Sequence, residues 1–412
     1  MHQRPIVQLR RSILPALLAG LLSFATLQTA VAAEDEALQH ARKLLSETIL
    51  VDGHNDLPWA VRNYEPAPGD IAAYDLRKRT PGQTDLPRLK QGGIGAQFWS
   101  VYTPGEAPGH YARTQLEQID IAKRIIARYP ESLQLATSVA EIRAAKRNGR
   151  IASLLGMEGG HAIENSLGAL RAYYDLGVRY MTLTHNTHTD WADSAAQPPK
   201  HHGLTPFGEE VVREMNRLGM LIDLSHTSDE TMEDVLRVSK APVIFSHSSA
   251  RAICDVPRNV PDSILRRLRD NGGIVMVTFV GGFIDPAIAA VQMPALAEWT
   301  RRSQGADEQT RKKLQEEILG NLEVPKTTIA KVAEHIEHIR DVAGVEHIGL
   351  GGDFDGNDVW PEGLSDVSMY PNLFAELIRR GWSDKDLKLL AGENLLRVMA
   401  RAEEVARAMS AE

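Results

Sequence analysis

Eight short apolar segments recur along the chain, and each ends in turn or polar residues. They are nearly continuous in Val, Ile, Leu and Met, as strands of a parallel sheet are when helices cover it. Strands of this kind are buried on both faces. We therefore predict eight buried strands, at residues 48–53, 94–101, 151–157, 178–184, 220–225, 242–246, 273–280 and 347–352.

Helical patterns lie between most of these strands. Segments 166–176, 206–218, 228–239 and 261–270 carry apolar residues three and four positions apart, which is the spacing of one helix face. Alternating strands and helices predict a parallel sheet with right-handed crossovers. Eight repeats of this unit predict an α/β fold, the (β/α)8 TIM barrel, with an open doubly wound sheet as the alternative.

One long segment departs from this rhythm. Residues 284–343 are rich in Glu, Lys and Ala, and we expect two or three helices there, inserted between strands seven and eight as a barrel insertion or a lid. No linker rich in Pro, Gly and Ser divides the remainder. Residues 34–412 are therefore predicted to form one domain.

The first 33 residues differ in composition from all that follows. Arg4, Arg10 and Arg11 precede an apolar stretch at about 13–27, and small residues follow at 30–32, a pattern typical of a cleaved signal peptide. The stretch is shorter than the roughly 20 residues that span a bilayer. We predict a signal peptide at 1–33, by the Sec or the Tat route, no stable membrane span after cleavage, and a periplasmic or secreted protein.

Charge and cysteine content narrow the function classes. The formal net charge is -8, and without a basic stripe we expect no nucleic-acid partner. Cys254 is the only cysteine. The mature chain is thus predicted to have no internal disulfide, even in an oxidising compartment.

Residues that can bind metals follow the predicted strands. Functional side chains of such barrels project from the carboxyl ends of the strands, so their convergence there predicts a metal-dependent active site. The other ten histidines, among them His188 and His335, are assigned no role. The seven candidates are His54, Asp56, Glu158, His185, His226, His247 and Asp353.

The types of these side chains indicate zinc. Imidazoles and carboxylates without a thiolate suit Zn²⁺, with Mn²⁺ or Co²⁺ as alternatives. A mononuclear iron site needs two histidines and one carboxylate, and it leaves the other candidates unexplained. A catalytic zinc normally has three protein ligands. Five ligands therefore predict two ions, with Glu158 bridging them. The other four predicted ligands are His54, Asp56, His226 and His247.

The chain resembles the membrane (renal) dipeptidases of the amidohydrolase-like barrel superfamily over nearly the whole mature sequence. The resemblance rests on the order and spacing of several segments. They read VDGHNDLP at 51–58, GMEGGH at 156–161, LTHN at 183–186, IDLSH at 222–226, PVIFSHSS at 242–249, RNVPD at 258–262 and GGDFDG at 351–356.

The resemblance implies residue roles. His54 and Asp56 would bind the first zinc, His226 and His247 the second, and Glu158 would bridge the two. His185, Arg258 and Asp353 match the substrate-site residues of the family. Glu158 takes the place of the carboxylated lysine that bridges the metals in many related barrels.

The expected reaction is hydrolysis of dipeptides, and the resemblance extends it to those with a C-terminal D-residue. A bridging hydroxide would attack the peptide carbonyl while His185 stabilises the developing charge, and Asp353 would move protons. Arg258 would bind the terminal carboxylate. The alternatives are an N-acyl-amino-acid deacylase, a β-lactamase-like enzyme, or a metal or solute-binding protein without turnover. A homodimer is expected because cyclic dimers are the commonest soluble oligomers.

Overall fold

The structure is a closed barrel of parallel strands surrounded by helices. The computed structural model describes residues 36–411 except 107–108 and 321, so the predicted signal peptide lies outside the described residues. The strands follow the order β2-β1-β9-β8-β7-β6-β5-β4-β3, and an additional pairing of β2 with β4 closes eight of them into a ring. The predicted (β/α)8 barrel is confirmed, and the open sheet is excluded.

Each of the eight barrel strands overlaps one predicted segment. A ninth strand, β3 (Leu133–Leu135), pairs only with β4 and was not predicted, because three residues are too few to show a pattern. The barrel strands are β1 (Leu50–Asn55), β2 (Ile94–Tyr102), β4 (Ile151–Glu158), β5 (Val178–Thr182), β6 (Leu221–Asp223), β7 (Ile244–Ser248), β8 (Ile274–Val277) and β9 (Ile348–Leu350).

The helices around the barrel begin at capping residues. Ser166, Thr205 and Ser228 each accept a hydrogen bond from a backbone N–H in the first turn of the helix that follows, which satisfies a donor that the helix leaves unpaired. No helix in the described ranges combines the length and apolarity needed to cross a membrane. These capped helices are α6 (Leu167–Asp175), α7 (Pro206–Leu218) and α8 (Asp229–Val238).

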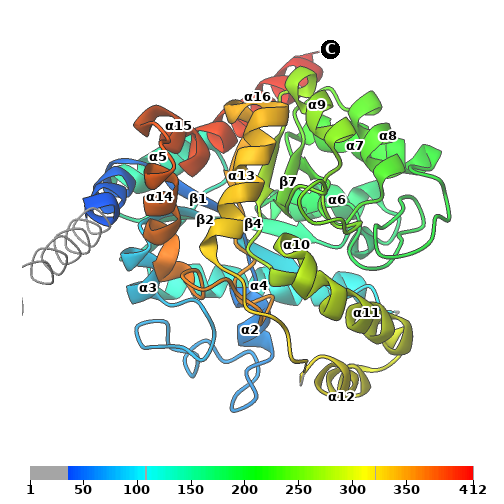
Figure 1. The fold of residues 1–412 in the computed structure, drawn as a ribbon. Helices are drawn as coiled ribbons and strands as arrows, with labels where there is room; N and C mark the ends of the chain where they lie inside the picture. The colour runs from blue at the N-terminus through cyan, green and yellow to red at the C-terminus, as the bar shows by residue number, and fades with distance from the viewer. Residues whose placement is uncertain (1–35, 107–108, 321, 412) are drawn as a thin grey trace, which may run out of the picture.

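The remaining helices complete the outer layer and cover the two ends of the barrel (Figure 1). They are α2 (Leu57–Arg62), α3 (Leu86–Gln91), α4 (Tyr111–Arg128), α5 (Val139–Arg147), α9 (Asp262–Asn271), α10 (Gly281–Ile284), α11 (Pro286–Ser303), α12 (Glu308–Ile318), α13 (Ile329–Ala343), α14 (Tyr370–Arg379), α15 (Asp384–Lys388) and α16 (Asn394–Ala411).

One end of the barrel is filled with apolar side chains and closed by α16. Val51, Phe98, Leu154 and Met276 belong to strands, and they share a buried cluster with Leu396 and other residues of α16. Packing at this end fixes how the strands converge. The opposite end, where the strands finish, stays free for polar side chains.

The segment predicted as an insertion divides into two parts. Helix α13 packs against α9 and α14 and is the regular crossover between β8 and β9, so the insertion itself comprises α10, α11 and α12. In Figure 1, α11 and α12 lie on the same side of the barrel as α2, away from α16. Because α2 directly follows β1, the inserted helices cover the carboxyl ends of the strands.

His335 connects α13 to two barrel loops. Its Nδ1 atom accepts a hydrogen bond from the Ala250 N–H, and its Nε2 atom donates to the carbonyl oxygen of Ile284, each over 3.0 Å. The neutral ring satisfies both contacts, and burial lowers the pKa of His335 to about 4. This histidine therefore has a structural role that the sequence pattern did not reveal.

We expect His335→Gln to flatten the pH dependence of stability in acid. The folded pKa is about 4 and the ordinary value is 6.5, so the unfolded chain takes up the proton first as pH falls. The contribution of neutral His335 is complete above pH 6.5 and is lost toward pH 4, a change of about 3 kcal/mol. Urea unfolding at pH 4.5 and 7, with a chelator present, measures it.

The exposed His110 provides the control, as His110→Gln should leave the difference between the two pH values unchanged. If lowering the pH destabilised the parent and the His335→Gln chain equally, His335 would not take up a proton when the chain unfolds.

Candidate functional site

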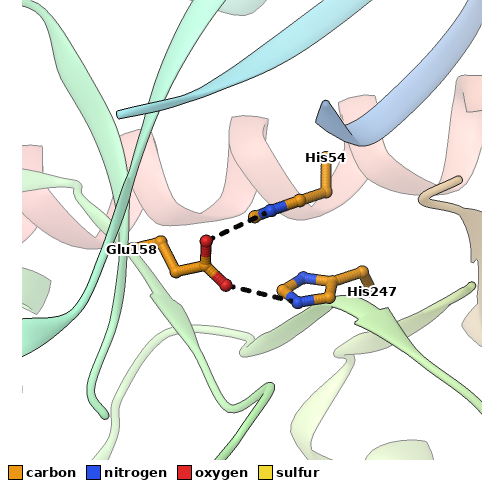
Figure 2. Close-up of side chains that lie close together, drawn as sticks. All are labelled: His54, Glu158 and His247. Carbon is orange, nitrogen blue, oxygen red and sulfur yellow. Dashed lines mark ion pairs between the residues drawn. The ribbon is translucent and has the colours of Figure 1, made fainter. Parts of the chain in front are cut away.

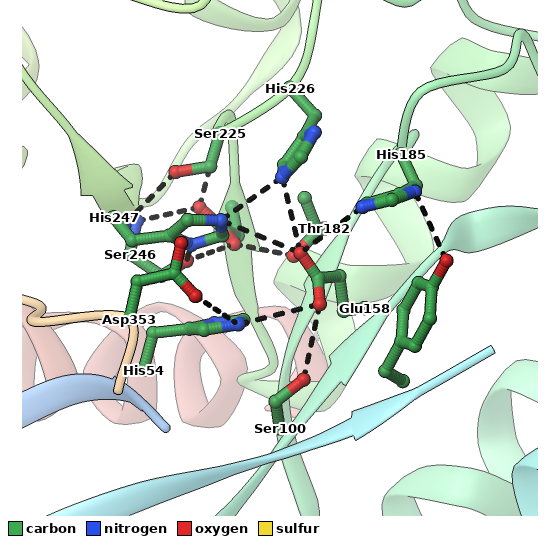
Figure 3. Close-up of polar contacts among 12 residues, drawn as sticks. His54, Ser100, Glu158, Thr182, His185, Ser225, His226, Ser246, His247 and Asp353 are labelled. Atoms are coloured by element: carbon green, nitrogen blue, oxygen red, sulfur yellow. Dashed lines mark hydrogen bonds and ion pairs between the residues drawn. The ribbon is translucent and has the colours of Figure 1, made fainter. Parts of the chain in front are cut away.

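All seven candidate ligands converge at the carboxyl ends of the strands. They come from six of the eight barrel strands or from the residues that follow them, and Figure 3 shows six of the seven candidates pointing toward one centre. Three overlapping groups have potential ligand atoms within 4.8 Å of one another. The groups are His54, Glu158 and His247; Glu158, His185 and His226; and His54, Asp56 and Asp353.

The Glu158 carboxylate is at the centre of the cluster. Its Oε1 atom lies 3.2 Å from His226 Nε2 and 3.4 Å from His247 Nε2, and its Oε2 atom lies 3.4 Å from His54 Nε2. Figure 2 shows the carboxylate between His54 and His247. Because each oxygen faces different imidazoles, this side chain has the geometry of a bridge between two cations.

His54 is held in one orientation by Tyr180. The Tyr180 hydroxyl donates to the Gly53 carbonyl oxygen at 3.2 Å and accepts from His54 Nδ1 at 2.9 Å. In the neutral ring, the Nε2 atom is therefore unprotonated and has a free lone pair. His54 Nε2 is buried and has no hydrogen-bond partner among the described residues, so a cation is the partner that fits it.

The charges around His54 favour a cation at the same atom. Burial alone lowers the pKa of His54, but Tyr180, Glu158 and Asp56 together raise it well above its ordinary value. The site therefore attracts positive charge at the Nε2 atom of His54. A proton supplies that charge in the free chain, and a metal ion would supply it in the loaded one.

His247 is oriented by a chain of hydrogen bonds beneath the cluster. Ser246 Oγ donates to Asp223 Oδ2 at 2.6 Å and accepts from His247 Nδ1 at 2.8 Å. Asp223 is fully buried on β6 and also accepts from the hydroxyl of Thr182. The Nε2 atom of His247 is therefore turned toward Glu158.

The protonation states suit metal binding. Burial lowers the pKa of His226 and of His247 well below the usual range, so both rings are neutral. Burial raises the pKa of Glu158, but the surrounding histidines outweigh it and hold that pKa well below its ordinary value. The two Nε2 atoms of His226 and His247 lie 3.0 Å apart. Neutral imidazoles facing an ionised carboxylate are the donors that zinc prefers.

Asp353 differs from the other carboxylates of the site. Burial raises its pKa well above the ordinary value, and Asp56 and Glu158 raise it further, although His54 opposes the shift. Its backbone has a φ of 64°, in the left-handed region, as has that of His226 at 67°. Such conformations cost free energy and are concentrated at functional sites. Asp353 is thus a carboxyl group poised to exchange protons.

Arg258 lies beside the cluster, and its guanidinium is anchored. It donates to Ser248 Oγ at 3.0 Å and to the His247 carbonyl oxygen at 3.1 Å, and it lies 5.1 Å from the ring centroid of Phe283. Phe283 lines the cavity described next, whereas Arg258 is not among the lining residues. The Nε atom of Arg258 is buried without a partner among the described residues.

A cavity of about 490 Å³ opens above the cluster. Glu158, His185, His226, His247 and Asp353 lie in its floor and walls. The inserted helices form its cover, and they contribute Trp299, Arg311 and Lys312 among others. The inserted helices, which were predicted to be a barrel insertion or a lid, therefore line the cavity above the candidate ligands.

Three further residues of this site have no signal in the sequence. Tyr180 and Asp223 lie inside ordinary strand patterns, and Glu106 lies in a loop after β2. Their contacts join positions far apart in the chain, such as the 126 positions between His54 and Tyr180. Only the alternation of strand residues, which turns some inward, could have suggested Tyr180.

Comparisons with known proteins find relatives over most of the chain. The model of the membrane dipeptidase family (peptidase family M19) matches residues 38–412. Dipeptidase 3 of Rattus norvegicus is 43% identical over 374 residues, covering 89% of this chain and 68% of that protein. Dipeptidase verJ of Clonostachys rogersoniana is 42% identical over 389 residues, covering 91% of this chain and 89% of that protein.

Solved structures are similar over most of the chain. The probable dipeptidase PvdM from Pseudomonas aeruginosa has a TM-score of 0.78 and 25% identity, over 90% of this chain and 100% of that one. A metallo peptidase from Rhodobacter sphaeroides, liganded with a phosphinate mimic of the dipeptide L-Ala-D-Ala, has a TM-score of 0.70 and 26% identity. That alignment covers 86% of this chain and 99% of the other.

Tyr180→Phe should weaken metal binding by about 10-fold to 100-fold, because it removes the group that orients His54. Competition with a chromogenic chelator measures the affinity for zinc. Tyr173→Phe is the matched control, since it also removes a buried hydroxyl bonded to a carbonyl oxygen, that of Ala162. Equal zinc affinity in the Tyr180 variant and the control would rule out this orienting role.

Proposed function

The chain belongs to the membrane dipeptidase family, peptidase family M19, and we propose that it hydrolyses dipeptides at a dinuclear zinc site centred on Glu158. The observation that carries this proposal is one carboxylate facing three imidazole Nε2 atoms within 3.4 Å. Dipeptides with a C-terminal D-residue are included as substrates, because the related metallo peptidase from Rhodobacter sphaeroides holds a mimic of L-Ala-D-Ala.

Five residues would hold the metals. Glu158 would serve both ions, and the tautomers set by Tyr180 and by Ser246 turn the lone pairs of two histidines inward. When bound, the two ions would polarise the peptide carbonyl and lower the pKa of the attacking water. The remaining four ligands would be His54, Asp56, His226 and His247.

Three further residues would act on the substrate. Asp353 accepts the proton of the attacking water and passes it to the leaving amine, for which its raised pKa suits it. His185 donates to the carbonyl oxygen, since its Nε2 atom lies 4.0 Å from Glu158 Oε1 on the cavity side. Arg258 binds the terminal carboxylate with the donors that Ser248 and His247 leave free.

We also propose that the protein is exported. The support is the charged and apolar pattern of residues 1–33, which would leave residues 34–412 as the mature domain in the periplasm or outside the cell. The homodimer expected from base rates stays a prediction.

We expect the zinc-loaded protein to cleave Ala-D-Ala, but not its C-terminal amide or its N-acetyl form. The amide lacks the carboxylate charge that would pair with Arg258. Arg258→Lys should therefore raise KM for the free dipeptide by about 10-fold and reduce the ratio between the cleavage rates of the free dipeptide and the amide. Release of D-alanine, before and after chelation, measures the rates.

Preferred cleavage of the acetylated form would instead identify a deacylase. Absence of cleavage of all three compounds, with zinc bound, would favour a binding protein without turnover.

Metal content tests the bridging role separately from activity. We expect about two zinc ions per wild-type chain, about one in His247→Ala, and fewer than one in Glu158→Gln, because the bridge serves both ions. Elemental analysis after dialysis against a zinc buffer gives the count. Asp355→Asn is the control, since that carboxylate accepts from the Gln83 N–H instead. Two ions retained in Glu158→Gln would exclude the bridge.

A further inference from the structure

Glu106 is a buried carboxylate that lacks a hydrogen-bond partner among the described residues. It follows β2 and is only 1% exposed, yet neither carboxylate oxygen has a hydrogen-bond partner among the described residues. It lines the same cavity as the candidate metal ligands. An ionised group buried in this way costs several kcal/mol unless something compensates it. Such a group is therefore expected to meet a ligand that enters the cavity.

The position of Glu106 in the barrel is opposite that of Arg258. Glu106 follows β2 and Arg258 follows β7, and these strands are four places apart in either direction around the closed ring. Glu158, on β4, lies between the two sides. The imidazole of His185 separates the carboxylates, with Nδ1 3.9 Å from Glu106 Oε1 and Nε2 4.0 Å from Glu158 Oε1. A negative and a positive group therefore flank the reacting centre.

A free dipeptide carries the complementary charges. Its ammonium and carboxylate groups are separated by two residues, a span of at most about 7 Å when extended. With the carboxylate toward Arg258 and the peptide carbonyl over Glu158, the ammonium group points to the side of β2. We propose that Glu106 binds the α-ammonium group of the substrate and so determines the requirement for a free amino terminus. This assignment rests on the proposed dipeptidase function.

The inserted helices supply the other charges around Glu106. Arg311 of α12 lines the cavity, is 8% exposed, and has an Nη1 atom without a partner among the described residues. It brings positive charge to the same cavity as Glu106. Lys312 of the same helix pairs instead with Glu65, at 3.0 Å.

The cover is attached to the loop that carries Glu106. The Gly305 N–H, between α11 and α12, donates to the backbone carbonyl oxygen of Glu106 at 2.9 Å. A longer peptide would place an uncharged amide at Glu106 and direct further residues against this cover. The same arrangement that binds the ammonium group therefore disfavours tripeptides.

Binding of a phosphinate mimic of L-Ala-D-Ala, with and without its amino group, tests the assignment independently of turnover. Calorimetry on the zinc-loaded wild-type protein should show about 10-fold to 100-fold preference for the mimic that carries the amine, as expected for a charge-assisted hydrogen bond. In Glu106→Gln the preference should fall below about threefold, with affinity for the mimic without the amine unchanged. That unchanged affinity would exclude an indirect effect through His185.

Glu308→Gln is the matched control, because this exposed carboxylate lines the same cavity and its loss should leave the preference intact. If Glu106→Gln does not fold, Glu106→Asp is the second variant. It keeps the carboxylate but moves it away from the ammonium group, so an intermediate preference is expected. The assignment is overturned if the wild type binds both mimics equally or binds neither. It is also overturned if the Glu106 variants keep the full preference for the amine. Preference for the amine without cleavage of any dipeptide supports it while refuting the proposed function.

Discussion

The site depends on one shared carboxylate. Glu158 ends β4 in the middle of the barrel mouth, where its two oxygens face imidazoles from β1, from β7 and from the loop after β6. The negative charge can be buried there only because these neighbours compensate it. The same charge draws cations to the centre. The other candidate ligands can therefore form a metal site only because they are arranged around this side chain.

A second layer of polar residues makes the shared contact possible. Tyr180 and Asp223 extend from the strands beneath the ligands and determine which nitrogen of His54 and of His247 faces Glu158. Without them each ring could rotate or exchange tautomers, and the lone pairs would no longer converge. The barrel thus contributes fixed orientations as well as nearby donors. The apolar packing at the α16 end provides the rigidity that this requires.

The insertion changes an open barrel mouth into an enclosed site. Helices α11 and α12 add apolar and charged side chains above the cluster and leave a cavity of about 490 Å³. Burial of these charges strengthens the attraction between them. In their proposed roles, Glu106 and Arg258 lie on opposite sides of the cluster, and together they would match the two charges of a small zwitterion. The distance between these charges and the cover together would then limit the length of the substrate.

The sequence alone determined the barrel and its candidate ligands, because apolar strand runs ending in His, Asp or Glu are local patterns, and parallel strands bring their carboxyl ends to one face. It could not separate α13 from the insertion, reveal β3, or give His335 a role. Tyr180, Asp223 and Glu106 were equally invisible, since their importance comes from burial and from partners across the barrel. Those contacts join residues far apart in the chain, such as His54 and Tyr180, which are 126 positions apart. Only closure of the barrel determined these contacts, because it makes residues neighbours independently of their order in the chain.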